Sequence, residues 1–210
     1  MEQIQVREYD LPDSYLYKKN IDATSVKVWI PKKTCLVLGR SNDPEESLHI
    51  QNIISDNIPV YKRPSGGETV ILTPNTVVIS IVFQQANFRG GRSYFDIINT
   101  RIKTLLEELG IKNVELEGIS DIAVNDVKIL GSALYQNKEV VFYHAVLNIS
   151  ESAELMERYI KHPAREPDYR KSRKHREFVT SLTKEKYEVN KMELITVLEK
   201  GLQEIRLSST

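Results

Sequence analysis

A basic segment with two glycines is the first part of this sequence whose residue types could bind an anion. It reads Lys62-Arg63-Pro64-Ser65-Gly66-Gly67-Glu68 and lies between two stretches of apolar, β-like residues. Glycine lets backbone N–H groups approach a ligand closely or take a positive φ, and the two cations can neutralise a phosphate or a carboxylate. Ser-Gly-Gly between strands is also ordinary turn chemistry. This basic loop (residues 62–68) alone therefore leaves an anion site and a hairpin turn open.

A second segment places a lysine beside three small residues. Lys128 alternates with apolar neighbours close to the turn Asn125-Asp126, a position where a lysine is usually a solvated charge at a sheet edge. Gly131-Ser132-Ala133 continue the same predicted strand. Three small residues in a row stabilise a strand little, but they leave room for a flat or thin ligand against it.

The elements that would position these two segments are mostly strands. Alternating and β-branched patterns predict extended segments over residues 4–9, 26–30, 35–38, 58–61, 69–72, 76–83, 114–116, 122–125, 127–135 and 140–149. Apolar spacing and capping residues predict helices over 44–55, 93–109, 152–159 and 190–205, with Ser93 as an N-cap. This pattern indicates an α+β fold with a mainly antiparallel or mixed central sheet flanked by helices. No linker divides the chain, so we expect one domain over residues 1–210.

Composition excludes several classes of protein. The 29 basic and 29 acidic residues balance, with a pI near 6.9, so the chain lacks the overall positive charge typical of nucleic-acid binding. Cys35 is the single cysteine, which excludes an internal disulfide and favours a reducing, cytoplasmic location. No signal peptide and no apolar run long enough to span a bilayer is present.

Four short motifs occur in order between residues 36 and 150. They are Gly39-Arg40-Ser41-Asn42, the basic loop, Ser120-Asp121-Ile122 with Lys128 and Gly131-Ser132-Ala133, and Tyr143-His144-Ala145-Val146-Leu147. In that order they resemble Gly-Arg-x-Gln-Asn, Arg-Arg-x-Ser-Gly-Gly-Gly, Asn-Asp-hydrophobic…Lys-x-x-Gly-Ser-Ala and His-His-Gly-Thr-Leu, which are signatures of the lipoate–protein ligase family within the biotin/lipoate ligase superfamily.

The resemblance implies a fold like that of biotin ligases and class II synthetases, and a two-step acylation. Lipoate or octanoate would react with ATP and Mg²⁺ to give an acyl-adenylate and pyrophosphate. A lysine of a lipoyl carrier domain, such as a glycine-cleavage H-like protein or a dehydrogenase E2, would then take the acyl group. We expect neither nucleic acid nor membrane among the partners.

The resemblance also implies roles for individual residues. Lys128 would bridge the acyl carbonyl and the α-phosphate and stabilise charge in both steps, and Asp121 would coordinate Mg²⁺. The other substrate- and nucleotide-binding residues would be Arg40, Arg63, Ser65, Gly66, Gly67, Gly131, Ser132, Ala133 and His144. A buried histidine paired with a backbone carbonyl is the alternative to a catalytic base at His144, so we expect this residue to be a wall of the pocket.

The sequence departs from the family pattern at several positions. Glu68 replaces the third glycine of the loop, and its carboxylate is unfavourable beside a phosphate unless it pairs with Lys62 or points away. Ser120 replaces the asparagine expected before Asp121. The chain ends at Thr210, before the C-terminal accessory domain of many relatives. We therefore expect it to work alone or with a separately encoded accessory subunit.

Two other functions compete with the ligase. An acyltransferase could carry octanoyl or lipoyl groups as a thioester, but Cys35 lies far upstream of the lysine motif in an apolar strand, where a small buried hydrophobe is expected. A non-catalytic subunit that binds lipoyl-AMP is suggested by Glu68 and Ser120.

A final feature is the basic segment (residues 161–176). Its charged residues are Lys161, Arg165, Glu166, Asp168, Arg170, Lys171, Arg173, Lys174 and Arg176. A solvated loop is the simplest interpretation, and docking of an acidic carrier or closure over the adenylate phosphate are the functional alternatives.

Overall fold

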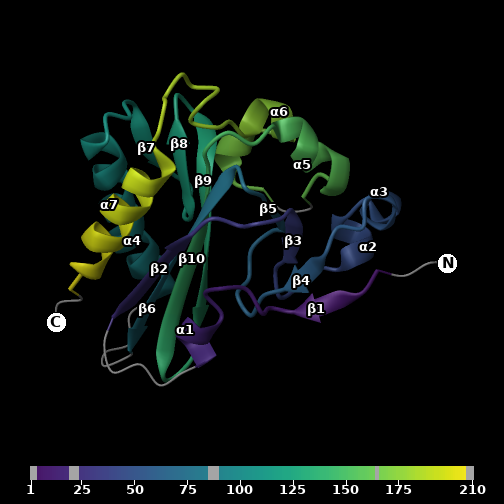
Figure 1. Cartoon of the computed structure of the whole chain (residues 1–210), viewed down its shortest axis with the longest axis horizontal. Coiled ribbons are helices and arrows are strands. Elements are labelled where there is room, and N and C mark those ends of the chain that lie inside the picture. Colours follow the sequence, from purple (N-terminus) through teal and green to yellow (C-terminus); the bar gives the residue numbers. More distant parts are fainter. Residues whose placement is uncertain (1–3, 19–23, 85–89, 164–165, 207–210) are drawn as a thin grey trace.

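The computed structural model describes residues 4–18, 24–84, 90–163 and 166–206. Its main element is a six-stranded sheet in which neighbouring strands are antiparallel (Figure 1). In spatial order the strands are β2 (Ser25–Trp29), β6 (Thr76–Gln84), β10 (Val140–Asn148), β9 (Val127–Gln136), β8 (Asp121–Val124) and β7 (Val114–Glu117). The strands predicted over residues 122–125, 127–135 and 140–149 are confirmed as the neighbouring strands β8, β9 and β10.

A smaller, mixed sheet lies beside the large one (Figure 1). In spatial order its strands are β1 (Val6–Glu8), β4 (Val60–Lys62), β3 (Cys35–Leu38) and β5 (Val70–Leu72). Strand β4 pairs in parallel with both neighbours, whereas β5 pairs with β3 in the antiparallel direction. The basic loop connects β4 to β5, so strands of one sheet hold both its ends. The two sheets together confirm the predicted α+β class.

The two central strands of the large sheet are almost entirely buried, because both faces of the sheet are covered. In β6 every residue except Gln84 is buried. Successive side chains of a strand point to opposite faces, and one set in β6, which includes Ile79 and Ile81, packs into the largest hydrophobic core. The alternate set, which includes Val78 and Val82, belongs to separate clusters on the other face.

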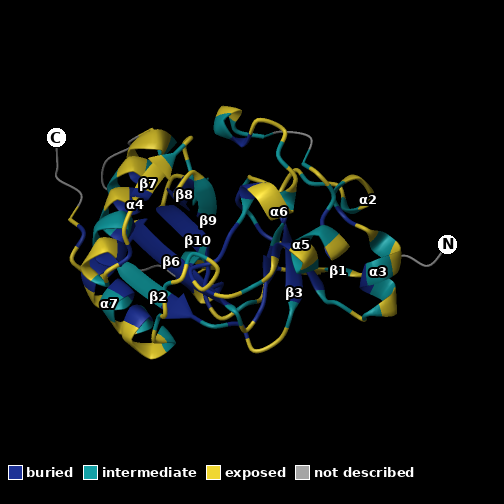
Figure 2. Ribbon diagram, turned by 90° about the horizontal axis from the view of Figure 1, so that it is seen from above, coloured by how far each residue is buried: buried dark blue, intermediate teal, exposed yellow. Residues whose placement is uncertain are grey.

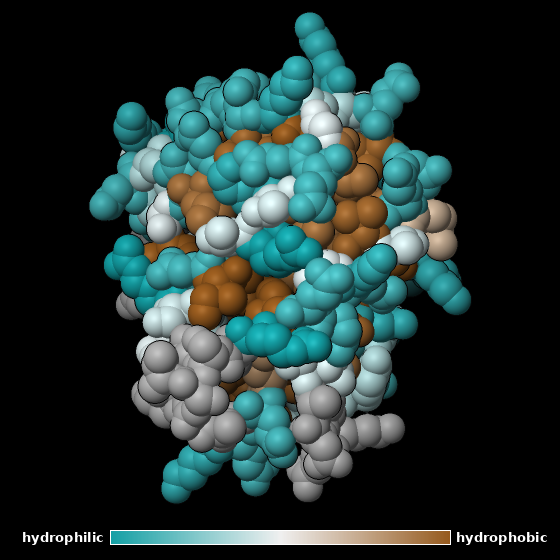
Figure 3. All heavy atoms as spheres, turned by 90° about the vertical axis from the view of Figure 1, so that its left-hand side faces the viewer, coloured by the Kyte–Doolittle hydropathy of each residue, from teal (hydrophilic) through white to brown (hydrophobic). Residues whose placement is uncertain are grey.

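Helices α4 (Gly91–Glu108) and α7 (Lys191–Gln203) cover one face of the large sheet (Figure 2). Their buried apolar residues recur at helical spacing and are Ile98, Ile102, Leu105, Leu106, Leu194, Leu198 and Leu202. The helices approach closely because Gly201 lacks a side chain, and a Cβ there would lie 2.5 Å from Leu105 Cδ2. The outer side of this helical layer is mostly hydrophilic (Figure 3).

The opposite face of the large sheet meets the small sheet and several short helices. These are α1 (Tyr15–Lys18), α2 (Pro44–Ser47), α3 (Ile50–Ser55), α5 (Ala153–Tyr159), the 3₁₀ turn η1 (Asp168–Arg170) and α6 (His175–Phe178). A second hydrophobic core joins the small sheet to α3 and α5 through Leu36, Val60, Ile53 and Tyr159. None of the helices in the described ranges is long and apolar enough to cross a membrane.

The predicted helix over residues 44–55 is wrong in its continuity. Asp43 caps α2 by accepting a hydrogen bond from Glu45 N at 2.8 Å, but the chain then becomes extended at Leu48. Leu48 forms a β-bridge with Ile160, and His49 N donates to Tyr159 O at 2.9 Å. Pairing with a distant segment therefore replaces one helical turn at Leu48 and His49. The local sequence does not encode this pairing, so its helical pattern continued through both residues.

One helix prediction and one strand prediction need smaller corrections. Helix α4 begins at Gly91 with Gly90 as its N-cap, so the predicted cap at Ser93 already lies within the first turn. The predicted first strand, residues 4–9, is reduced to Val6–Glu8. Within the described residues 11–18, the chain forms the short helix α1, and residues 19 and 20 lie outside the described ranges.

The end of β3 makes a contact that only glycine permits. A Cβ on Gly39 would lie 1.9 Å from Gly67 O and 2.9 Å from Asn42 Oδ1.

We expect Gly39→Ala to lower the free energy of unfolding by about 1–3 kcal/mol, because the basic loop would have to move. Urea denaturation measures this change. Gly90→Ala is the matched control, since a Cβ there meets nothing within 4 Å, and equal stability of the two variants would contradict the contact.

Candidate active site

A cavity of about 820 Å³ lies between the small sheet and the face of the large sheet opposite α4 and α7. Strands β6, β9 and β10 line one side, and β5 with part of the basic loop lines the other. Residues of the basic segment, together with Phe178 and Val179 just after it, form a third wall. Both segments that the sequence marked for chemistry therefore reach the same space.

A β-bulge in β9 directs Lys128 into this cavity. Asp121 pairs with Gly131, but the register shifts by one residue after Ile122, so that Lys128 pairs with Ala123 and Ile129 is the extra residue. A bulge of this kind reverses the alternation of side chains and redirects the next one. Lys128 consequently lies on the same face as Gly131, whose hypothetical Cβ would be 2.7 Å from Lys128 Nζ.

The carboxylate of Asp121 holds the lysine ammonium. Lys128 Nζ lies 2.8 Å from Asp121 Oδ1, with side-chain exposures of 26% and 7%. Ser120 Oγ donates to the same oxygen at 3.2 Å, and Tyr169 Oη donates to Oδ2 at 2.8 Å. An ammonium has three N–H groups, so Lys128 keeps donors for oxygens of a bound substrate.

The predicted role of Asp121 as a magnesium ligand stays a prediction. Its carboxylate already accepts contacts from Lys128, Ser120 and Tyr169, so a magnesium ion would share its oxygens with these protein groups. Among the described residues, the group of three carboxylates close enough to share a metal is Glu115, Glu117 and Asp126. None of these lines the cavity.

Arg63 organises the basic loop from within. Its side chain is buried at 4% exposure, and its guanidinium donates to Ser65 Oγ and to backbone carbonyls of Val37, Gly66 and Glu68 at 2.7–3.0 Å. Burial lowers the pKa of Arg63 to about 10, so it stays charged at neutral pH. Although Arg63 lines the cavity, most of its donors hold the loop in shape.

Ser65 and His144 connect this loop to the large sheet. Ser65 Oγ accepts a hydrogen bond from Arg63 Nε at 2.9 Å and lies 2.5 Å from His144 Nε2. Its own O–H can therefore donate to a neutral imidazole. Burial, followed by the charge of Arg63, lowers the pKa of His144 well below its usual value. His144 lines the cavity as predicted, but it pairs with a hydroxyl rather than with a backbone carbonyl.

The small residues of β9 form the floor between the lysine and the loop. Gly131 lies under the Lys128 side chain, and a Cβ on Gly67, which has φ +84°, would lie 3.8 Å from Ala133 Cβ. Ser132 donates both its N–H and its hydroxyl to Ser120 O, at 2.9 and 2.7 Å. These contacts fix β9 against the residue before Asp121.

The comparisons with known proteins agree with this geometry. Residues 12–203 match the model of the lipoyl protein ligase A/B catalytic domain.

The chain belongs to this family.

Its relatives include lipoate-protein ligase A of Psychrobacter cryohalolentis, which is 27% identical over 145 residues. This match covers 69% of the chain but only 41% of that protein, so the chain spans about two fifths of its length.

Solved structures of the family have the same fold. A lipoate-protein ligase A bound with ATP superposes with a TM-score of 0.76 at 21% identity, over 91% of this chain and 77% of that one. The bipartite lipoate protein ligase of Thermoplasma acidophilum gives 0.78 at 18% identity, over 91% and 75%. A biotin protein ligase of Aquifex aeolicus gives 0.56 at 13% identity, over 96% and 68%. The predicted likeness to biotin ligases is therefore confirmed at the level of fold.

Three residues that the family resemblance assigned to binding lie outside the cavity lining. Arg40 is exposed, and it contacts the basic loop through its backbone N–H, which donates to Ser65 O at 2.9 Å. Ser65 is buried behind the loop, and Gly66 has no neighbour within 4 Å of a hypothetical Cβ.

Glu68, which replaces the third glycine of the family loop, and Lys62 both bind Asn42. Asn42 Nδ2 donates to the Glu68 carboxylate at 3.5 Å, and the Lys62 ammonium donates to Asn42 O at 3.2 Å.

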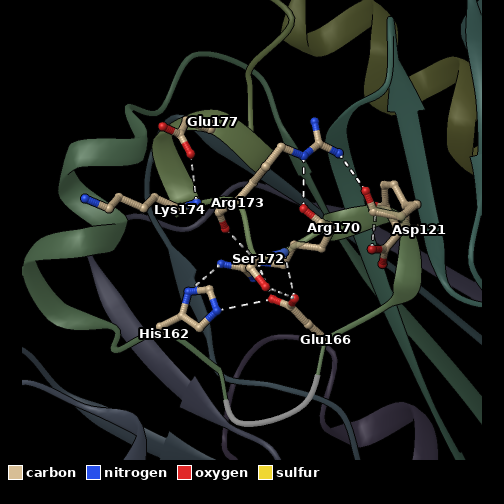
Figure 4. A network of polar contacts seen from close by, with 9 residues as sticks. Asp121, His162, Glu166, Arg170, Ser172, Arg173, Lys174 and Glu177 are labelled. Carbon is tan, nitrogen blue, oxygen red and sulfur yellow. Dashed lines mark hydrogen bonds and ion pairs between the residues drawn. The ribbon is translucent and has the colours of Figure 1, made fainter.

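The basic segment is more ordered by internal contacts than a solvated loop would be. Arg170 is buried at 4% exposure, pairs with Glu166 at 3.3 Å and lies 4.7 Å from the centre of the Phe178 ring. Glu166 also binds His162 and Ser172 (Figure 4). The sequence prediction missed Arg170 and Phe178 as cavity residues, because a charge-rich stretch broken by prolines indicates solvent exposure. Arg165 lies outside the described residues.

The buried imidazole has a measurable consequence for stability. Because the pKa of His144 is lowered in the folded state, the unfolded chain binds a proton near pH 6.5 that the folded protein does not. The contribution of the neutral His144 imidazole to the free energy of unfolding is complete above that pH and is lost as the pH falls below it. We expect His144→Gln to reduce the slope of unfolding free energy between pH 6.5 and 5 by roughly 1 kcal/mol per pH unit. Urea denaturation across this range tests it, and parallel slopes would contradict the assignment.

Proposed function

We propose that this chain is the catalytic domain of an ATP-dependent lipoate–protein ligase, which activates lipoate or octanoate as an acyl-adenylate and transfers the acyl group to a carrier lysine. Family membership supports the proposal. The observation that carries it is the convergence of Lys128 and Gly67 on one cavity. We also propose that residues 1–210 act as a single domain.

The size and lining of the cavity suit such substrates. Its volume of about 820 Å³ lies in the range of pockets that enclose ligands of drug size. Apolar residues including Val37, Leu72 and Val78 line it beside polar groups. An acyl chain can lie on apolar walls while its carboxylate and a nucleotide phosphate meet the lysine and the loop. The solved relative bound with ATP supports a nucleotide as the second substrate.

The first step forms an acyl–phosphate bond and breaks the bond between the α- and β-phosphates of ATP. A carboxylate oxygen attacks the α-phosphorus, and pyrophosphate leaves. Catalysis of such a step consists mainly of positioning and charge neutralisation. Lys128 supplies a cation held by Asp121, and the backbone around Gly67 faces it across the floor formed by Gly131 and Ala133.

The second step transfers the acyl group from AMP to an amine. The acceptor lysine attacks the acyl carbonyl, an N–C bond forms, and AMP departs as the C–O bond of the anhydride breaks. The same Lys128 ammonium can stabilise the oxyanion and the leaving phosphate. Mg²⁺ remains a proposed requirement of the ATP reaction, and Asp121 remains its predicted ligand.

A lipoyl carrier domain is the proposed acceptor. The Thermoplasma acidophilum relative is a bipartite ligase solved together with its E2 lipoyl domain, which supports a lipoyl domain as the carrier and a separately encoded second subunit. An E2 protein or a glycine-cleavage H-like protein would supply such a domain. Neither nucleic acid nor a membrane is part of the proposal.

Cys35 argues against the thioester alternative. Its side chain is buried, and burial raises the pKa of the thiol to about 12, so almost no thiolate exists at neutral pH. It also does not line the cavity. A free buried thiol suits a cytoplasmic location, which we propose for this protein.

The central test is formation of lipoyl-AMP by the purified protein with lipoate, ATP and Mg²⁺, detected by mass spectrometry, with a lysate present to supply any partner.

We expect Lys128→Met to lower the rate of lipoyl-AMP formation at least about 100-fold, because it removes the cation from the transition state. Stability should fall by only about 1–3 kcal/mol, since Ser120 and Tyr169 still donate to Asp121. Lys191→Met, whose ammonium donates to Pro74 O away from the cavity, is the control. Absence of acyl-AMP and of acylated carrier in the wild type would refute the ligase.

A further inference from the structure

The position of the Lys128 ammonium depends on its counterion. The ammonium ends a flexible four-carbon chain. Within the described residues its polar partner is Asp121, and the centre of the Phe178 ring lies 5.9 Å away. Whatever orients the Asp121 carboxylate therefore also orients the lysine.

A tyrosine from the basic segment provides that orientation. Tyr169 Oη donates to Asp121 Oδ2 at 2.8 Å, while Lys128 contacts Oδ1 at the same distance. Contacts on two different oxygens fix the plane of the carboxylate. Without the tyrosine hydroxyl, Oδ2 would be free to accept a second N–H from Lys128, and fewer donors would remain for substrate oxygens.

Tyr169 is itself held on several sides. Its ring centre lies 5.0 Å from that of Phe178, and its carbonyl accepts from Arg173 Nη2 at 2.9 Å. Gly118, which has φ +58°, allows the turn before β8 to approach, since a Cβ there would lie 3.8 Å from the tyrosine ring. Burial and then the charge of Asp121 raise the pKa of Tyr169, so the phenol keeps its proton and acts as a donor.

The same segment also contacts the main chain of the lysine. Thr180 N donates to Lys128 O at 2.9 Å, and Val179 forms a β-bridge with Lys128. Arg173 Nη1 donates to Asp126 O in the turn just before β9, at 3.2 Å. Residues 169–180 thus bind both the backbone that carries Lys128 and the carboxylate that holds its ammonium.

We propose that Tyr169 is a positioning residue that sets the location of the Lys128 ammonium through the carboxylate of Asp121. The proposal rests on the ligase function proposed above and adds to it a residue outside the motifs that define the resemblance. Tyr169 does not line the cavity, so its removal changes the placement of the lysine without removing a substrate contact.

A second tyrosine offers a matched control. Tyr159 Oη donates to Asp56 Oδ2 at 2.7 Å, and Arg158 pairs with the same carboxylate at 2.7 Å. This cluster repeats the combination of phenol, carboxylate and cation, but none of its three residues lines the cavity. Tyr159→Phe removes the same kind of hydrogen bond at a site with no proposed chemistry.

The kinetic test compares Tyr169→Phe with Tyr159→Phe in the formation of lipoyl-AMP. We expect Tyr169→Phe to lower kcat at least about tenfold and to leave the KM values for lipoate and ATP within about twofold, because the loss concerns the transition state. Tyr159→Phe should keep kcat within about twofold. A Tyr169→Phe enzyme with normal kcat, or with only its KM changed, would overturn the proposal.

A double-mutant cycle separates positioning from general structural damage. If Tyr169 acts through Asp121, then adding Tyr169→Phe to an Asp121→Ala protein should change kcat by less than about twofold. Independent effects would multiply instead, and that outcome would contradict the proposed route through the carboxylate.

A structural readout keeps this proposal distinct from the ligase proposal. In a crystal structure of the Tyr169→Phe protein, we expect Lys128 Nζ either to contact both Asp121 oxygens or to leave Asp121. An unchanged single contact at 2.8 Å, as in the wild type, would overturn the positioning role. A wild-type protein that forms no lipoyl-AMP would refute the ligase, while this structural comparison would still test the placement of Lys128.

Discussion

The ion pair between Lys128 and Asp121 is the interaction on which the candidate site depends. Neither partner is fully exposed, and a charge in such a place is costly unless another charge and hydrogen bonds compensate it. Asp121 receives the ammonium and two hydroxyl groups, so its charge is balanced while the lysine keeps N–H groups for a substrate. The carboxylate of Asp121 therefore positions the lysine cation.

The sheet geometry around this pair explains why the strand is irregular there. A regular β9 would place Lys128 on the face that packs against α4 and α7, where a charge would lie in the largest hydrophobic core. The bulge at Ile129 moves the lysine to the cavity face and leaves Ile129 and Leu130 both buried. Gly131 completes the arrangement, because any side chain there would occupy the space of the lysine. The small residues of β9 thus leave space for the side chain of Lys128 as well as for a ligand.

Three sets of contacts hold the basic loop in shape from the side away from the cavity. Arg63 uses its guanidinium to bind the carbonyls of the loop, Ser65 joins the arginine to His144, and Gly39 lets the end of β3 touch Gly67. A buried arginine that satisfies carbonyls has a different role from an exposed one that binds phosphate, although the two look identical in a sequence. Mutations of Arg63 would therefore change loop structure and substrate binding together.

The amino-acid sequence by itself determined the class of fold and the two segments that matter. Alternation and β-branched runs are local properties, so β6, β9 and β10 were predictable, and the order of motifs around Lys128 indicated the family. Only the tertiary structure decided which groups meet. Tyr169 reaches Asp121 across 48 residues, the bridge between Leu48 and Ile160 interrupts a predicted helix, and the bulge sets the direction of Lys128. The physical reason is that these contacts depend on the pairing of distant segments, whereas periodicity reports only the face on which each residue lies.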